Sequence, residues 1–261
     1  MKRFFRMPYD DMMSCLEHLM TGARPRGVMV VMVLSITVTW FVYVPVHELL
    51  HAYGLIWTGG EVGTLNMKWY YGGEYLAKWF PFIESGSDYA GQLTDFDTKG
   101  SDWRYLACDF APFMLTVLIG VPLLRFCTRR RRAVLSGPAV VLGLAPFYNL
   151  PGDYYEMASI MSTRALTTLG GGGHPPRFEG LRSDDIFTLI PDVFLRPAEL
   201  GLQGGFFPTV FAMLVVFESM ILSVVLVFVT YRLGDLVARV LVGPAPVFTA
   251  PASRTRRTRA D

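Results

Sequence analysis

The stretch His47-Glu48-Leu49-Leu50-His51 ends a long apolar run and has the pattern H-E-x-x-H. Two histidines four residues apart lie on one face of a helix, so both imidazoles can bind one zinc ion. The glutamate between them faces the same side and can take a proton from a water molecule at the metal. Polar groups inside apolar sequence lose hydration, which is costly without a function. The motif therefore predicts a zinc-dependent hydrolase that works in or at a membrane.

Composition and segment length support the membrane part of this prediction. The chain of 261 residues is 52% hydrophobic and only 18% charged, and its apolar residues come in long blocks. A helix needs about 20 apolar residues to span a bilayer. Four segments reach this length: 27–57, 105–127, 133–160 and 206–231. They predict an all-α multi-pass membrane protein with about four transmembrane helices.

The third of these segments contains three prolines, Pro138, Pro146 and Pro151. Each proline removes a helical hydrogen bond, so we expect a kinked helix here. Broken helices at membrane depth occur where they line a protein-enclosed or water-filled cavity. The prolines are therefore compatible with an active site in this region.

The distribution of positive charge predicts the orientation. Lys and Arg number five in 1–26, five in 125–132 and six in 232–261, which is 16 of the 24 in the chain. The connections 58–104 and 161–205 hold four each and are richer in acidic residues. Cytoplasmic segments of membrane proteins carry the excess of Lys and Arg. We therefore expect a plasma-membrane protein with both termini in the cytoplasm and these two connections outside.

The predicted organisation has five parts. They are a cytoplasmic amphipathic segment (1–26), a three-helix catalytic core (27–160), an extracytoplasmic loop (161–205), a fourth transmembrane helix (206–231) and a basic tail (232–261). Within them, 10–20 is expected to form a surface helix and 183–200 an interfacial helix. The basic tail is read as an anchor beside anionic lipid and not as a nucleic-acid site, because no recognition element accompanies it.

A helical zinc pair needs a third protein ligand from elsewhere in the fold. The acidic residues inside the four apolar segments are Glu48, Asp109, Asp153, Glu156 and Glu218. Asp109 and Glu218 are expected to make structural hydrogen bonds between helices. The two histidines outside the motif are weaker candidates, since His18 falls in the surface helix and His174 in a loop rich in glycine and proline.

A depth estimate selects among the remaining acids. His47 follows Gly27 by 20 residues, and Asp153 follows Arg132 by 21. At about 1.5 Å of rise per residue, both lie roughly 30 Å from the cytoplasmic boundary. We therefore predict Asp153 as the third ligand, with Glu156, one turn beyond, as the alternative.

The HELLH motif, followed on a later apolar helix by Asn149-Leu150-Pro151-Gly152-Asp153, resembles the site-2 intramembrane metalloproteases. Those enzymes pair the two motifs in a three-helix core, usually with Asp-Gly where this chain has Gly-Asp. The resemblance covers about a third of the chain. It implies His47, His51 and Asp153 as Zn²⁺ ligands, Glu48 as the catalytic base and Asn149 near the substrate backbone. The family's site generally lies toward the cytosol, whereas the charge pattern puts this one outside, so the two inferences conflict.

The connection after the zinc motif predicts a β-hairpin. Residues 64–71 and 74–80 are strand-like and aromatic, and Gly72-Gly73 joins them with the freedom that tight turns require. Two roles for this hairpin stay open. Its exposed edge can hold an extended peptide by strand addition, or it can be an interfacial cap anchored by Trp69, Tyr70, Tyr71 and Trp79.

Together these features predict a zinc-dependent intramembrane endopeptidase whose partners are a membrane-protein or peptide substrate and the lipid bilayer. Glu48 would assist attack of water on a peptide carbonyl and return the proton to the leaving amine. Four histidines in the chain are too few for a multi-histidine di-iron enzyme. A zinc hydrolase acting on lipid esters or amides, and a membrane scaffold with a relict metal site, remain alternatives.

Overall fold

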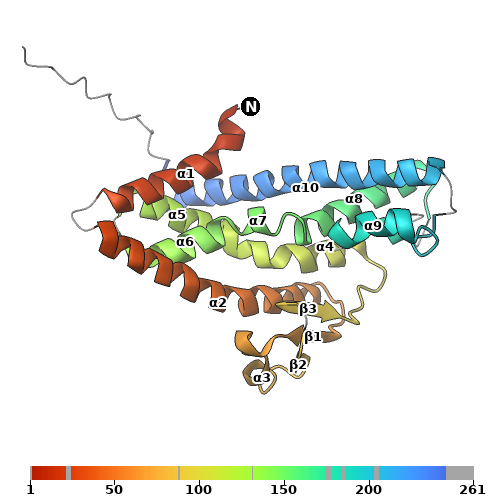
Figure 1. Cartoon of the computed structure of the whole chain (residues 1–261), viewed down its shortest axis with the longest axis horizontal. Helices are drawn as coiled ribbons and strands as arrows, with labels where there is room; N and C mark the ends of the chain where they lie inside the picture. The colour runs from red at the N-terminus through yellow and green to blue at the C-terminus, as the bar shows by residue number, and fades with distance from the viewer. Residues whose placement is uncertain are drawn as a thin grey trace, which may run out of the picture.

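The computed structural model describes residues 2–21, 25–87, 89–130, 132–173, 178–183, 186–202 and 206–244. Two long helices frame it, α2 (Pro25–Trp57) and α10 (Phe206–Leu241), and shorter helical segments fill the space between them (Figure 1). A small sheet is attached to one side of α2. The molecule is thus mostly helical, as predicted.

Within the described residues, three helical segments are long and apolar enough to cross a membrane: Pro25–Trp57, Asp102–Cys127 and Phe206–Leu241. They contain the predicted spans 27–57, 105–127 and 206–231. Most of the large apolar side chains of α2 and α10 are exposed on the surface of the molecule. Lipid can solvate such a surface and water cannot, so these helices indicate association with a membrane.

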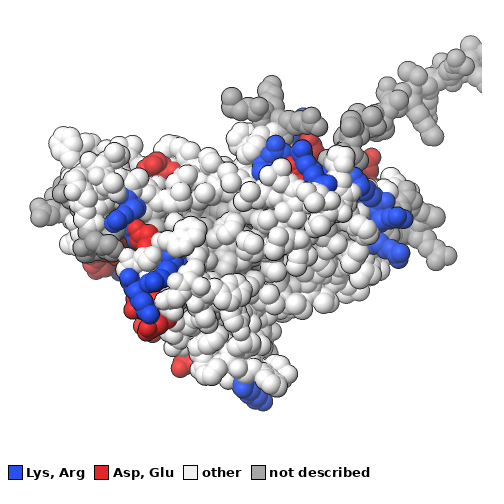
Figure 2. All heavy atoms as spheres, turned by 180° about the vertical axis from the view of Figure 1, so that it is seen from behind, with Lys and Arg blue, Asp and Glu red and all other residues white. Residues whose placement is uncertain are grey.

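The surface has the matching charge distribution. Figure 2 shows Lys, Arg, Asp and Glu gathered toward the two ends of this face and on the attached sheet, with a broad uncharged band between them. A band of this kind fits the hydrocarbon layer of a bilayer, where exposed charges are costly.

The segment 133–160 is not one helix, so a fourth span is not confirmed. It consists of the 3₁₀ turn η4 (Ala133–Leu135), α6 (Ser136–Gly143), α7 (Ala145–Tyr148) and the start of α8 (Asp153–Leu169). Pro146 is in the first turn of α7 and Pro151 lies in the turn before α8, where neither needs a backbone N–H to continue a helix. The prolines therefore break the segment more completely than the predicted kink.

The broken segment packs inside the molecule. Helix α6 lies against α2, while α8 lies against α10 and α4 (Asp102–Phe110). One core cluster joins Tyr43, Phe113, Tyr154 and Val227 from four different segments. Because this packing brings the start of α8 beside the second half of α2, the HELLH motif and the Asn-Leu-Pro-Gly-Asp turn become neighbours.

The predicted hairpin is wrong. The sheet has three strands, β1 (Thr64–Met67), β2 (Ile83–Ser85) and β3 (Gly91–Thr94), in the order β2-β1-β3. β1 is antiparallel to β3 and parallel to β2. Gly72, at φ +84°, ends the 3₁₀ turn η1 (Trp69–Tyr71), and the chain then enters the short helix α3 (Gly73–Leu76). Residues 74–80 are thus the crossover to a parallel strand and not a returning strand. We refer to β1–β3 with η1 and α3 as the sheet cap.

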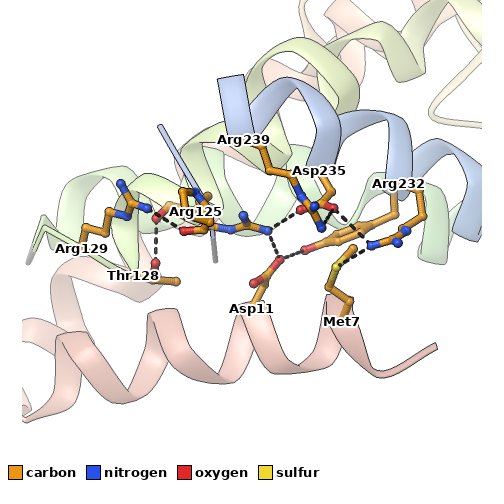
Figure 3. Close-up of polar contacts among 10 residues, drawn as sticks. Met7, Asp11, Arg125, Thr128, Arg129, Arg232, Asp235 and Arg239 are labelled. Carbon is orange, nitrogen blue, oxygen red and sulfur yellow. Dashed lines mark hydrogen bonds and ion pairs between the residues drawn. The ribbon is translucent and has the colours of Figure 1, made fainter. Parts of the chain in front are cut away.

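Helix α1 (Lys2–Met20) lies on the surface but has a buried polar residue at its centre. Arg125 Nη2, in α5 (Val121–Cys127), donates to Asp11 Oδ2 at 3.0 Å and to Asp235 Oδ1 at 2.7 Å (Figure 3). The hydroxyl of Tyr231 donates to the same Asp11 oxygen at 3.0 Å. A buried ion pair needs such additional hydrogen bonds to offset desolvation. The network joins α1, α5 and α10 at the end of the bundle opposite the sheet cap.

The helix predicted within 183–200 is present as α9 (Ile186–Leu195), which packs against α10; its position at a membrane interface stays a prediction. Ile186, Leu189 and Val193 are buried against the bundle, and Phe187 and Phe194 are exposed. The spacing of three and four residues between the buried positions gives the helix one inward face.

Candidate metal centre

Three side chains converge where α2 meets the start of α8. His47 Nε2 and His51 Nε2 are 3.1 Å apart, one turn apart on α2. Asp153 Oδ2 lies 3.1 Å from His47 Nε2 and 3.7 Å from His51 Nε2. These are the three ligands predicted from sequence, and together they form a group able to hold a metal ion.

The donor set fits zinc. Two imidazole nitrogens and one carboxylate oxygen are ligands that zinc prefers, and a tetrahedral site with metal–ligand bonds near 2.05 Å separates its ligands by about 3.3 Å. The three separations bracket that value. Asp153 Oδ2 is shielded from solvent and faces the two imidazole nitrogens, at 3.1 Å from His47 Nε2 and 3.7 Å from His51 Nε2. A carboxylate and two imidazoles directed at one point suit a shared cation, which would accept a lone pair from each of them.

The Nδ1 atoms of both histidines, which face away from the triad, have hydrogen-bond partners. His51 Nδ1 lies 3.0 Å from the carbonyl oxygen of Cys108, to which only a protonated nitrogen can donate. That tautomer leaves the Nε2 lone pair of His51 directed toward the triad. His47 Nδ1 lies 2.7 Å from the hydroxyl of Tyr43, one turn earlier on α2. Such outer hydrogen bonds orient metal ligands in zinc enzymes.

Asn149 extends this support. Its Nδ2 donates to the Tyr43 hydroxyl at 3.3 Å and to the Ala145 carbonyl at 3.0 Å. The residue therefore lies behind His47 and links the turn before α8 to the metal triad through Tyr43. Its predicted contact with a substrate backbone stays a prediction.

Glu48 faces a cavity of about 370 Å³ beside the triad. The α2 helix turns its carboxylate toward β3, whose Gly91 lies against it. The cavity is open on one side and mainly polar; besides Glu48, His51 and Asp153 it is lined by Gly91, Gln92, Leu93, Phe96, Tyr105, Cys108, Asp109, Glu156, Arg182 and Ser183. Glu48, His51 and Asp153 thus line one open, polar space.

The other acidic residues considered from the sequence as possible ligands lie outside the triad. Glu156 lines the cavity and accepts a hydrogen bond from the Tyr105 hydroxyl, but it lies outside the triad. Asp109 is buried in the cavity wall. Glu218 is exposed on α10, which does not favour the predicted hydrogen bond between helices. His174 lies outside the described residues, and His18 is on α1.

Several residues of the site were not predicted. Tyr43 precedes His47 by four residues, so helical spacing alone could have identified it as a neighbour of the ligand. No spacing in the sequence identifies Gly91 and Arg182 as neighbours of the ligands, because the sheet brings Gly91 to the site and a loop brings Arg182. Arg182 forms two hydrogen bonds with the Asp102 carboxylate, at 2.8 and 3.2 Å, and one with Thr163 at 3.0 Å. It holds the loop before α9 against α4 and α8.

Comparison of the chain with protein-family models, with curated proteins and with solved structures found no match. The chemistry of the site therefore rests on its own residues and distances.

Proposed function

We propose that this protein is a membrane-embedded, zinc-dependent endopeptidase of the site-2 type. The observation that carries the proposal is the meeting of His47, His51 and Asp153, whose Oδ2 is buried beside the two imidazole nitrogens. The second support is Glu48, whose carboxylate lies in the same cavity as His51 and Asp153.

His47, His51 and Asp153 would hold the zinc ion, which supplies an acidified water molecule and a Lewis acid for the scissile carbonyl. Glu48 takes one proton from the attacking water as its oxygen bonds to the carbonyl carbon. It then delivers that proton to the amide nitrogen as the carbon–nitrogen bond breaks. Water is consumed, one carboxylate and one amine are formed, and Glu48 returns to its starting state.

The free edge of β3 favours a peptide as the substrate. β1 uses residues 65 and 67 to pair with β2, through Leu65 N–H to Phe82 O and Gly86 N–H to Met67 O. Lys68 N–H bonds to Ala90 O on the other side. Backbone groups alternate in direction along an antiparallel strand. Gly91 and Leu93 therefore direct their N–H and C=O groups away from β1, along an edge that no described strand covers.

An extended peptide can add to this edge by main-chain hydrogen bonds. Because Gly91 lies against Glu48, a strand added there would run past the catalytic base. The proposed substrate edge is thus β3 and not the 64–80 hairpin expected from sequence. A lipid ester has no row of amides to use this edge.

The proposed topology has four membrane passages, with the broken 133–160 segment as the third. Arg125, Arg129 and Arg130 lie in and just after α5, which is at the end of the bundle away from α8 and α9 (Figure 1), and Arg232 follows the fourth predicted span. The positive-inside rule assigns that end and both termini to the cytoplasm. The site then opens to the extracytoplasmic side of the plasma membrane, unlike the usual arrangement of the family it resembles.

The direct test uses purified protein in detergent with fluorescein-labelled casein, an unfolded polypeptide able to adopt strand conformation. Wild-type protein with stoichiometric zinc should release labelled fragments. Glu48→Gln should keep its zinc and release none, because the base is lost and the ligands remain. Glu218→Gln is the matched control, since this acid is exposed on α10, and it should cleave as wild type does.

Equal cleavage by wild type and Glu48→Gln would contradict the proposal. Release of fatty acid from phosphatidylcholine vesicles, without casein cleavage, would transfer the site to lipid chemistry. Zinc binding with neither activity would favour a scaffold.

A further inference from the structure

The sheet cap lies beside α2 instead of beyond its end. The hydroxyl of Tyr71, in η1, accepts a hydrogen bond from Trp40 Nε1 at 3.3 Å, and its ring centre is 5.7 Å from that of Phe41. Farther along α2, Leu49 packs against the apolar core of the sheet. The Tyr53 ring lies 6.5 Å from that of Phe80. The cap therefore runs back along α2, with η1 as its tip.

The position of η1 along α2 gives its depth. The apolar stretch from Gly27 to Val46 has 20 residues, the length that crosses about 30 Å of hydrocarbon. Phe41 precedes His47 by six residues, which is about 9 Å at 1.5 Å per residue. If the hydrocarbon ends near His47, the tip of the cap lies about 9 Å inside it. Amphipathic elements bound at a membrane surface insert to roughly 5–10 Å.

The exposed side chains of the tip match this environment. Trp69 is 71% exposed and Tyr70 44% exposed, and the Tyr70 ring centre is 4.7 Å from that of Tyr71, which contacts the exposed Trp40 and Phe41. Trp and Tyr combine an apolar ring with one polar group, so they favour the boundary between headgroups and acyl chains.

Charge around the tip is compatible with insertion. Lys68 Nζ lies 5.7 Å from the centre of the Tyr70 ring. A lysine at this position can extend its ammonium group to lipid phosphates while its methylenes stay in the apolar layer. Glu74, the acid nearest to the tip in sequence, is exposed one turn later in α3.

We propose that η1 is a membrane-inserted tip: Trp69, Tyr70 and Tyr71 enter the lipid bilayer beside the middle of α2. The partner is the acyl-chain region just below the headgroups of a phospholipid leaflet. The inference is independent of the peptidase activity, because it depends only on where the cap contacts α2 and on what it exposes there.

The test measures tryptophan fluorescence of the full chain in phosphatidylcholine vesicles brominated near the headgroup end of the acyl chains. One variant keeps only Trp69, with Trp40, Trp57, Trp79 and Trp103 replaced by Phe. The matched control keeps only Trp57, which is 70% exposed but lies ten residues beyond His47, about 15 Å outside the expected boundary.

The bromolipid should quench most of the emission of Trp69 and little of that of Trp57, and acrylamide in the water should do the reverse. Quenching of Trp69 by acrylamide to the same degree as Trp57, without quenching by bromolipid, would overturn the proposal.

A second measurement avoids multiple tryptophan substitutions. Cys15, Cys108 and Cys127 are buried, so Tyr70→Cys provides an accessible thiol for a nitroxide spin label. In phosphatidylcholine vesicles, dissolved oxygen should relax this label more strongly than a water-soluble nickel chelate. The opposite ranking would place residue 70 in water and overturn the proposal.

Discussion

Gly91 lies directly against the carboxylate of Glu48. A Cβ atom built at position 91 would be 2.6 Å from Glu48 Cδ and 2.9 Å from Oε2, closer than side-chain atoms pack. Glycine at this position therefore allows the backbone of β3 to approach the proposed base. The two residues connect the strand edge to the chemistry of the site.

Gly91→Ala should lower casein cleavage strongly while zinc content stays at the wild-type level. The added methyl group must displace the Glu48 side chain or the strand, and a catalytic base works only within hydrogen-bond reach of its proton. Gly27→Ala is the control, because a Cβ at position 27 would meet no atom within 4 Å. Wild-type cleavage by Gly91→Ala would show that the contact does not position Glu48.

His47→Ala, His51→Ala and Asp153→Ala should each reduce bound zinc well below one ion per chain. Each change removes one of three protein ligands. Elemental analysis by mass spectrometry of the purified variants measures the metal. Glu156→Ala is the matched control and should keep its zinc. Full occupancy in Asp153→Ala together with loss in Glu156→Ala would give the ligand role to Glu156.

Tyr43→Phe should weaken zinc binding by roughly 10–100-fold, the usual effect of losing an outer hydrogen bond to a ligating histidine. The change removes the hydroxyl 2.7 Å from His47 Nδ1 and keeps the ring. Competition with a chromogenic chelator measures the affinity. The control Tyr155→Phe removes a buried hydroxyl of α8 that has no hydrogen-bond partner among the described residues. Equal affinities of the two variants would exclude a role for Tyr43 at the metal.

Leu93→Pro should abolish casein cleavage with zinc content and detergent stability retained. Proline removes the outward N–H of β3 that a substrate strand needs, and leaves the bonds to β1 in place. Leu93→Ala controls for the lost side chain and should be milder. If Leu93→Pro folds and cleaves normally, the substrate does not use this edge.

Cysteine labelling from outside intact cells should modify Ser87→Cys and spare Arg130→Cys. Ser87 is in the connection assigned to the extracytoplasmic side, and Arg130 is in the basic loop assigned to the cytoplasm. Labelling after the cells are opened confirms that both thiols are reactive. The opposite pattern would reverse the orientation and turn the site toward the cytosol.

The sequence predicted those features that follow from counting residues and apolar positions along the chain. Counting helical rise from the two charged boundaries predicted Asp153 as a partner of His47, and His47 Nε2 is 3.1 Å from Asp153 Oδ2. The count assumed a continuous helix before Asp153, whereas that segment is broken into short helices. Three of the predicted spans also lie in long apolar helices. Length and hydropathy determine such elements, because each helix satisfies its own backbone hydrogen bonds.

Features that depend on long-range pairing were missed. Gly72-Gly73 suggested a hairpin turn, but β1 found its antiparallel partner at β3, beyond a helical crossover. Strand pairing between distant residues is decided by packing, here around Leu65, Met67 and Ile83, and not by a local turn. In the same way, no local pattern links Asp11 to Arg125, 114 residues later.

The Arg125 network also sets an order of assembly. Asp11 leaves the ribosome more than 200 residues before Tyr231 and Asp235. At a synthesis rate of about 5–20 residues per second, the carboxylate waits roughly 10–40 s for its last partners. Until then the N-terminal helix has no complete docking surface and must stay in the water or at the lipid headgroups. Helix α10, as it packs, therefore closes this end of the bundle over a segment that was made more than 200 residues before it.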